Sequence, residues 1–527
     1  MRDTAICEAL REAGLWPETS GESTDLTVGK ADEDLLPAIC QAWESCRGRA
    51  DGRADRAAAG RGDWFRQARE AGARLTWSFP GLDQTRTVRW LGARLAWWPD
   101  GIPHRRRVGL VSSRLGQQLD QHKSWFAALR TACMRLNPQH DILVTAGQTA
   151  TQRFVQRCGR LFGLTLLDIQ AAGSEATAWR RWGRQVVASV PPPPHAPARV
   201  LLSPPLAAGS GAECLEELAG LPLSDRVILA LCDQILALHI RPEGNVQRLL
   251  RARLQRDGFP AASVFLALAP ELVGREQAAE LLDAGAVGWL LMDPVEPGKN
   301  DPPTPWLPAS SAPRRAAPLV PCPPAALWSY LTHCTRRRSG PWPGENEETF
   351  LDDLILDRPG ADHSALAALW RIVRSGRLMA SSELVRGSTP VISLTEVPLS
   401  ELGRLRAYRS HLGRWDFEPY GICIRRDWLE RRGTRPVCYG DEALWESLPP
   451  AERPFFQKRQ SCTPGGKQID WTVEQEWRHV GDLRLDGIPA DAALLFVASE
   501  TEARQLAPAS PWPIVVLSAD EPGGSTG

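Results

Sequence analysis

The stretch from Asp141 to Gly163, DILVTAGQTATQRFVQRCGRLFG, constrains the fold of this chain more than any other. Its first five residues, 141–145, have the length and apolar character of a buried strand. After a turn of small residues, apolar side chains recur at helical spacing at Phe154, Cys158 and Leu161, which predicts a helix. A strand that ends in such a turn is a common phosphate site, because the following helix presents unpaired N–H groups and partial positive charge. The alternative is an ordinary strand–helix turn that binds nothing, and this stretch alone does not decide between the two.

Two residues of this turn have specific expected roles. Gly147 would let the backbone approach a ligand closely, and Thr149 would cap the helix. The surrounding chain continues the pattern of alternating strands and helices, which predicts a parallel sheet with helices on both faces. Strands are predicted over 107–112, 164–169, 200–203, 263–269 and 287–292, and helices over 117–136, 246–256 and 276–285. Ligands of such sheets bind beyond the carboxyl ends of the strands.

Length and composition limit the remaining choices. A chain of 527 residues is too long for one core, so two to four domains are expected. The 62 Lys and Arg balance the 62 Asp and Glu, so no global field attracts nucleic acid or a membrane. The 12 Cys form no CxxC pair, which disfavours a metal site and a disulfide framework. Without a signal-peptide pattern or an apolar run near ~18 residues, a cytoplasmic location is expected.

Shifts in composition divide the chain. All four Tyr lie after residue 320, which suggests that a domain of different ancestry begins there. The five predicted parts are a weakly structured segment over 1–60, a small Trp/Arg-rich module over 61–104, an α/β domain over 105–295, a Pro-rich linker over 296–320 and an α+β domain over 321–520. For the second part, an edge strand and helix docked on the next domain is the alternative.

Three short motifs in the α/β domain carry a family resemblance. They are the turn Leu143–Gly147, the loop Leu236–Val246 before a helix, and the sequence Leu281–Ala286, which contains Asp-Ala-Gly-Ala. In this order they resemble the SLOG superfamily, the Rossmann-like domains of DprA/Smf proteins, LOG phosphoribohydrolases and nucleotide sensors of bacterial defence. The PGGxGTxxE motif of the LOG enzymes is absent, and Glu243–Val246 stands in its place. This departure argues against phosphoribohydrolase chemistry and leaves binding.

The resemblance implies a nucleotide ligand, either NAD or an NAD-derived nucleotide; no metal is expected, because the cysteines are scattered. The residues that it places nearest to the nucleotide are Ser112, Arg114, Gly147, Thr149, Gly244 and Asn245.

The α+β domain carries a second resemblance, in four phrases over about 90 residues. They are Ser393–Leu399, Tyr420–Leu429, Pro436–Tyr439 and Glu474–Arg478. In this order they resemble the AbiGi-type abortive-infection family of phage-defence proteins. Strands at these phrases and near the end of the chain predict an antiparallel-leaning sheet, and a helix is predicted over 365–376.

More distantly, the layout is similar to DarT-like ADP-ribosyltransferases. That similarity implies a catalytic set of His333, Thr335, Glu476 and Arg478. Glu476 would stabilise an oxocarbenium-like state, and His333 would hold the ribose hydroxyls. The alternative is that Glu476 and Arg478 are ion-paired supports on one face of a strand, and that His333 is a satisfied core residue. Convergence of the four residues in one cleft separates these interpretations.

Three functions follow from these patterns. The first is a bacterial defence protein, in which the SLOG-like domain senses a nucleotide and the AbiGi-like domain is the effector, acting on NAD if it is an enzyme. The second is a DprA-like protein that binds single-stranded DNA through the Trp/Arg-rich region over 64–107. The third is a non-catalytic, antitoxin-type interaction protein. A protein partner or a homo-oligomer stays open in each case.

Overall fold

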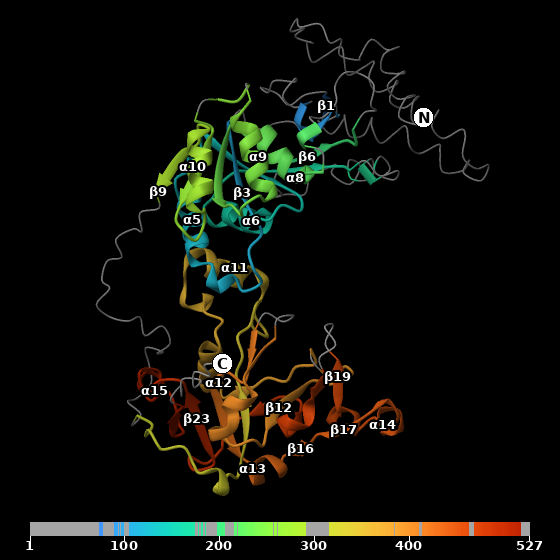
Figure 1. The fold of residues 1–527 in the computed structure, drawn as a ribbon, viewed down its shortest axis with the longest axis vertical. Coiled ribbons are helices and arrows are strands. Elements are labelled where there is room, and N and C mark those ends of the chain that lie inside the picture. Colours follow the sequence, from blue (N-terminus) through green and yellow to red (C-terminus); the bar gives the residue numbers. More distant parts are fainter. Residues whose placement is uncertain are drawn as a thin grey trace, which may run out of the picture. The chain divides into compact units, whose positions relative to one another are not determined.

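The computed structural model describes most of residues 105–290 and 316–517, together with short pieces between 73 and 99. The main gaps inside these ranges fall between 174 and 215 and at 410–413 and 463–467. The predicted segment over 1–60 and most of the predicted linker lie outside the described residues. The chain divides into two compact units, shown in Figure 1: unit 1 lies within 1–116, 122–294 and 354–357, and unit 2 within 117–121, 295–353 and 358–527.

Unit 1 is built on a mixed, mostly parallel sheet. Its order is β1-β2-β6-β5-β4-β3-β7-β8-β9 in the described part of the chain. Neighbouring strands are parallel from β6 to β9, whereas β2 is antiparallel to β6 and β1 is antiparallel to β2. The strands are β1 (Ala73–Thr76), β2 (Ala96–Pro99), β3 (Arg106–Ser112), β4 (Asp141–Ala146), β5 (Leu166–Ala171), β6 (Ala198–Leu202), β7 (Gln234–His239), β8 (Val264–Leu268) and β9 (Val287–Leu290). The predicted parallel α/β sheet is confirmed, and its arrangement is consistent with a Rossmann-like fold.

The helices of unit 1 cover both faces of this sheet. They are α5 (Lys123–Met134), α6 (Gln152–Leu161), α8 (Leu223–Leu231), α9 (Asn245–Leu254) and α10 (Arg275–Asp283). Right-handed crossovers place α5 and α6 on one face and the other three helices on the opposite face. Gly109 of β3 permits close packing of α8, because a Cβ there would lie 2.5 Å from Ile228 Cγ2 and 2.8 Å from Cys232 Sγ.

The Trp/Arg-rich region is part of this sheet where it is described. Ala96 and Trp97 of β2 pair with Leu202 and Leu201 of β6. Trp97 is buried, as expected for a residue of the core. The pairing corresponds to the edge-strand alternative rather than to a separate small module.

Unit 2 is built on a mostly antiparallel sheet. Its order in the described residues is β16-β21-β12-β10-β15-β23-β24, and only β23 and β24 pair in parallel. The strands are β10 (Tyr330–Cys334), β12 (Val391–Thr395), β15 (Gly421–Arg425), β16 (Arg435–Pro436), β21 (Glu476–Val480), β23 (Ala493–Val497) and β24 (Ile514–Val516). The α-helices are α11 (Glu347–Leu356), α12 (Ala365–Ser375), α13 (Arg426–Glu430), α14 (Glu442–Ser447) and α15 (Glu500–Leu506).

Smaller elements complete unit 2. Four two-stranded pairs lie outside the main sheet in the described residues: β11 (Arg377–Leu378) with β22 (Leu483–Arg484), β13 (Ala407–Arg409) with β14 (Arg414–Asp416), β17 (Cys438–Gly440) with β18 (Phe456–Lys458), and β19 (Gln460–Cys462) with β20 (Gln468–Asp470). The 3₁₀ helices of both units are η1 (Leu119–Gln121), η2 (Glu216–Leu218), η3 (Ala325–Leu327), η4 (Pro359–Ala361), η5 (Leu399–Leu405), η6 (Arg453–Phe455) and η7 (Trp471–Glu474).

The two faces of the unit 2 sheet are covered differently. We call one the helix face, because Leu331 and Ile422 pack there with residues of α12, α13 and α15. We call the other the loop face, where Cys423 and Phe496 pack against η5 and Phe417. Because side chains alternate along a strand, neighbouring residues of one strand serve different faces.

The ends of α12 follow from its sequence. Ser364 accepts a hydrogen bond from the N–H of Ala367 and caps the helix start. Gly376 has a left-handed conformation, with φ +58°, and ends the helix as predicted.

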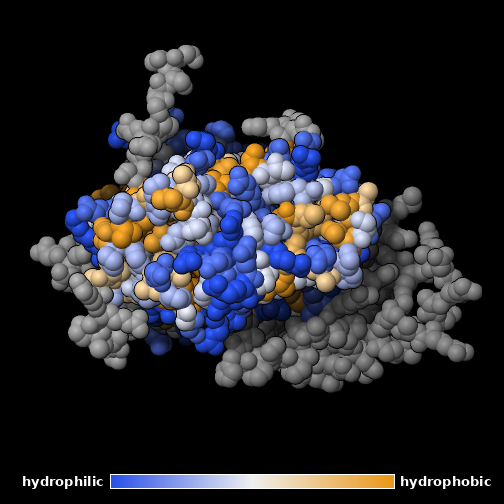
Figure 2. Space-filling view, turned by 90° about the horizontal axis from the view of Figure 1, so that it is seen from below, coloured by the Kyte–Doolittle hydropathy of each residue, from blue (hydrophilic) through white to orange (hydrophobic). Residues whose placement is uncertain are grey.

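The surface is mixed where Figure 2 shows it. A hydrophilic band separates patches of hydrophobic residues, so this face is not one continuous apolar surface. In the described part of the chain, no helix has both the length and the apolar character needed to cross a bilayer.

Candidate functional site

The candidate site in unit 1 lies at the carboxyl edge of its sheet, where the strand order reverses. Chain order runs outward from β3 to β6 on one side and from β7 to β9 on the other. In open α/β sheets, ligands bind at such a switch point, beyond the carboxyl ends of the strands. The loops after β4, β3 and β7 lie next to each other here, because their strands are neighbours.

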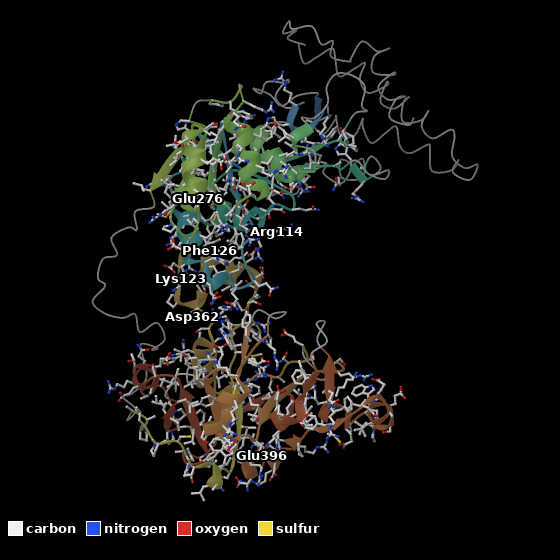
Figure 3. All side chains as sticks on the ribbon, viewed as in Figure 1. Arg114, Lys123, Phe126, Glu276, Asp362 and Glu396 are labelled. Atoms are coloured by element: carbon white, nitrogen blue, oxygen red, sulfur yellow. The ribbon has the colours of Figure 1, made fainter. Side chains whose placement is uncertain are left out.

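Ser113 fastens the loop after β3 to the loop after β7. Its N–H donates to the carbonyl of His239 at 2.8 Å, and its hydroxyl accepts from the N–H of Arg241 at 3.0 Å. The Arg241 guanidinium in turn donates to the carbonyl of Arg114 at 2.6 Å. These bonds hold two exposed arginines, Arg114 and Arg241, at the edge between β3 and β7. Figure 3 labels Arg114 there, and Glu276 in the first turn of α10.

Two titratable groups, Asp225 and His239, interact electrostatically with the two arginines. Burial raises the pKa of Asp225, in the first turn of α8, to about 6, although the charge of Arg114 opposes this shift. Burial also lowers the pKa of His239, and the charges of Arg241 and His122 add to the shift. His239 Nδ1 is buried without a hydrogen-bond partner among the described residues. The edge therefore combines cationic groups with a carboxyl group that takes up a proton near pH 6.

The loop after β7 leads directly into the N-terminus of α9. Gly244 is the N-cap, and no side chain of the described residues caps the helix. Glu243 has a left-handed backbone, φ +53°, and its N–H donates to Gln247 Oε1 at 2.8 Å. Asn245 is exposed as the first residue of the helix. The uncapped first turn presents N–H groups beside Arg241, an arrangement that suits an anion.

The loop after β4 provides open space. A Cβ added at Gly147 would meet no atom of the described structure within 4 Å. Gln148, next to it, has φ +69°. Backbone strain of this kind in non-glycine residues is concentrated at functional sites.

Two of the six predicted nucleotide residues have other roles. Thr149 does not cap the helix: its hydroxyl donates to the carbonyl of Ala146 at 2.9 Å, and the N-cap of α6 is Thr151. Ser112 is buried, since its hydroxyl accepts from Trp125 Nε1 at 2.9 Å and donates to the carbonyl of Ser113 at 2.8 Å. Ser112 supports the loop rather than facing a ligand. The start of α6 was predicted two residues too early, at Thr149 instead of Thr151, because a threonine hydroxyl can also form a hydrogen bond within a turn.

Four residues at this edge were not predicted from the sequence. They are Ser113, Asp225, His239 and Arg241. Ser113 is next to Arg114, and His239 and Arg241 lie within the loop Leu236–Val246, so the two predicted loops already contained the signal. Asp225 was not detectable, because only the fold brings α8 to Arg114.

In unit 2, Glu476 and Arg478 form a pair on β21. Arg478 Nε donates to Glu476 Oε1 at 2.9 Å, and Nη2 donates to Oε2 at 3.0 Å. Arg478 is also bonded to the carbonyls of Pro454 and Phe456 and to Gln457 Oε1. The N–H of Glu476 donates to the hydroxyl of Tyr439 at 2.9 Å. This geometry is that of an ion-paired support.

His333 and Thr335 lie on the opposite face of the sheet. Thr332 pairs with Thr395, which pairs with Glu476, so these three side chains share the loop face. His333 follows Thr332 and therefore belongs to the helix face; its Nδ1 lies 2.9 Å from the carbonyl of Ser393. The Thr335 hydroxyl donates to the carbonyl of Ala365, at the start of α12.

The structure therefore does not bring the four predicted catalytic residues into one cleft. Burial lowers the pKa of His333 to about 4, which keeps the ring neutral at physiological pH. No cluster of three His, Cys, Asp or Glu side chains suited to a metal ion occurs in the described residues.

Comparison with known proteins gives one weak structural likeness. No protein-family model matches the chain, and no curated protein matches it. The crystal structure of DNA processing protein A (DprA) from Streptococcus pneumoniae matches with a TM-score of 0.29 and 12% identity, over 55% of this chain and 89% of that one. Neither value is high enough to support a statement about function.

Proposed function

We propose that unit 1 binds a nucleotide through its phosphates, at the carboxyl edge between β3 and β7. The observation that carries this proposal is the junction of the two loops by Ser113, which holds Arg114 and Arg241 beside the uncapped N-terminus of α9. Guanidinium groups and helix N-termini are both suited to phosphate oxygens. The open space over Gly147 would accept the rest of the ligand.

The resemblances noted in the sequence suggest the wider role. They make unit 1 a sensor of NAD or an NAD-derived nucleotide and unit 2 the effector of a two-part bacterial defence protein. An NAD-consuming activity of unit 2 is proposed from the resemblance alone. The geometry adds no support, because both carboxylate oxygens of Glu476 accept hydrogen bonds from Arg478.

The binding proposal is tested by calorimetric titration of the full chain with NAD, ADP-ribose and ADP. We expect at least one of the three to bind, and the double variant Arg114→Gln/Arg241→Gln to weaken that binding more than tenfold, since charge-assisted hydrogen bonds contribute ~1.5–3 kcal/mol each. Arg160→Gln is the matched control, because Arg160 is exposed in the last turn of α6, at the other edge of the sheet. Lack of binding by all three nucleotides, or equal affinities of the double variant and the control, would overturn the proposal.

The effector role has a separate test. Nicotinamide release from NAD is measured with the full chain, with Glu476→Gln and with Asp486→Asn, which removes an exposed carboxylate of unit 2. Release that is kept in Asp486→Asn and lost in Glu476→Gln, at a temperature at which circular dichroism shows the variant to be folded, supports the effector proposal. Lack of release by the parent chain removes its NAD-consuming form.

A further inference from the structure

A single carboxylate in unit 2 is surrounded by three guanidinium groups. Asp416 lies 2.8 Å from Arg409, 3.6 Å from Arg336 and 3.8 Å from Arg414, measured between the nearest nitrogen and oxygen atoms. We call these four residues and Glu474 the Asp416 cluster. Asp416 is 8% exposed, whereas 34% of the Arg336 side chain is exposed. The cluster is therefore mostly buried but remains accessible to solvent at Arg336.

The β13–β14 hairpin builds one side of the cluster. Arg409 pairs with Arg414, and Ala407 pairs with Asp416, so all four side chains point to one side of the hairpin. Tyr408 and Trp415 pair on its other side. Arg336 comes from the segment that follows β10 on the loop face, and Glu474 from η7, just before β21.

The guanidinium groups are not satisfied by the residues around them. Nε of Arg336, and Nε and Nη2 of Arg414, are buried without a hydrogen-bond partner in the described structure, as is Oδ1 of Asp416. Buried polar atoms without a partner are rare, and each costs ~1–3 kcal/mol. The two Nε atoms face Oδ1 of Asp416 at 3.6 and 3.8 Å, beyond hydrogen-bond length, and no ion pair is made by Nη2 of Arg414 in the described structure. Three positive charges therefore share Asp416 and Glu474, and their unsatisfied donors point to a missing anion.

Glu474 adds a group that takes up and releases protons near neutral pH. Burial raises its pKa to about 7, the negative charges of Glu476 and Asp416 add to the shift, and Arg336 and Arg409 oppose it. Its Oε1 lies 3.7 Å from Arg409 Nη2. The other titratable groups that interact with it are Cys334 and Tyr439, the pKa values of which are both raised, mainly by burial. Neither thiol nor phenol ionises below pH 8, so Glu474 controls the charge of the cluster between pH 6 and 8.

Backbone strain marks the same place. Gln475, between Glu474 and Glu476, has φ +44°, and Phe417, next to Asp416, has φ +56°. Together with Gln148 and Glu243 of unit 1, they account for four of the six non-glycine residues with positive φ in the described part of the chain. Strain of this kind persists where surrounding structure enforces it, most often at functional sites.

We propose that Arg336, Arg409 and Arg414 bind the phosphate group of a small ligand in unit 2, and that Glu474 is the acid–base group beside it. With Glu474 protonated, three arginines and one aspartate give the cluster a net charge of +2, which matches a phosphate dianion; ionised Glu474 reduces it to +1. The ligand is therefore held more tightly when Glu474 carries its proton. This site goes beyond nucleotide binding by unit 1 and does not depend on it.

The test uses the full chain carrying Arg114→Gln/Arg241→Gln, so that the edge of unit 1 does not contribute. Pyrophosphate is titrated calorimetrically at pH 8 and pH 6. In this background we expect Arg336→Gln and Arg414→Gln each to weaken binding at least tenfold. Arg484→Gln, which removes an exposed arginine of unit 2, should stay within twofold. Absence of binding in the background chain, or equal affinities of the Arg414 and Arg484 variants, would overturn the proposal.

Glu474→Gln gives a result that misfolding cannot imitate. The amide matches the neutral carboxyl group, so this variant should bind pyrophosphate several-fold more tightly than the background chain at pH 8. At pH 6 the two should bind almost equally. Comparing variants at one pH cancels the ionisation of pyrophosphate itself. Weaker binding by Glu474→Gln at pH 8 would contradict the assigned role of this group.

ADP in place of pyrophosphate identifies the source of the phosphate. Equal affinity would assign the site to the anion itself, and tighter binding of ADP would assign it to a nucleotide; both results support a phosphate site.

Discussion

Arg478 is bonded to Glu476 through both carboxylate oxygens, at 2.9 and 3.0 Å, although only one residue separates them on β21. The guanidinium is buried, and its Nη1 donates to the carbonyls of Pro454 and Phe456, in the segment at the start of β18. Glu476 therefore neutralises an arginine that holds this segment against the sheet.

The first prediction concerns this pair. Glu476→Gln leaves the buried charge of Arg478 without its counter-ion, and we expect the free energy of unfolding to fall by about 2–4 kcal/mol. Asp486→Asn breaks a pair of the same spacing, Arg484 with Asp486, which is exposed, so it should change stability little. Calorimetric melting temperatures of both variants check this; equal shifts would show that Glu476 has no supporting role.

The second prediction concerns Arg253, which is buried in unit 1. Its guanidinium donates to the carbonyls of Leu229, Cys232 and Asp233, and so ties the end of α8 to the start of β7. Arg253→Met keeps the length of the side chain but leaves these carbonyls without their donor. We expect a loss of about 3–5 kcal/mol, measured by urea denaturation. Arg248→Met, at an exposed position of the same helix, is the control and should change stability little.

The third prediction compares two glycines. Gly109→Ala places a Cβ against Ile228 and Cys232, so it should destabilise the chain by about 1–3 kcal/mol. Gly147→Ala meets no neighbouring atom and should leave the melting temperature almost unchanged. If the open space over Gly147 holds a ligand, this second variant should nevertheless weaken nucleotide binding. A destabilised Gly147→Ala variant would argue against the assigned open space.

The fourth prediction concerns pH and stability. The pKa of Glu474 is raised in the folded chain to about 7 from its ordinary value of 4.5, so the folded state holds this proton more tightly than the unfolded state. The contribution of Glu474 to stability therefore falls as pH rises from about 4.5 to about 7, and stays low above that. Glu474→Gln removes this loss.

Unfolding of the parent and Glu474→Gln chains is compared between pH 5 and pH 8. The variant should gain about 1–3 kcal/mol over the parent by pH 8, with most of the difference appearing between pH 5 and pH 7. Parallel pH profiles of the two chains would contradict the assigned pKa. All other groups titrate in both chains, so the difference isolates residue 474.

Local patterns predicted the elements well, because their causes lie within a few residues. The strand predicted over 107–112 is Arg106–Ser112, and the helix predicted over 365–376 is Ala365–Ser375 followed by Gly376. Apolar spacing and a glycine stop are sufficient for such predictions.

The site in unit 2 was not predictable in the same way. Whether His333 and Glu476 share a face depends on the register of β10, β12 and β21, which are far apart in the sequence. A shift of one residue in register exchanges the faces, and no local pattern fixes it. Arg336, Asp416 and Glu474 likewise meet only after folding.

The antiparallel ribbon of β1 and β2 has a consequence for how this protein is handled. β2 covers the outer edge of β6, where Leu201 and Leu202 are buried. A chain shortened to begin at residue 105 keeps all the parallel strands but leaves that edge uncovered. Uncovered edges pair with other chains, so such a fragment should aggregate, and the β1–β2 ribbon protects the sheet from pairing with other chains.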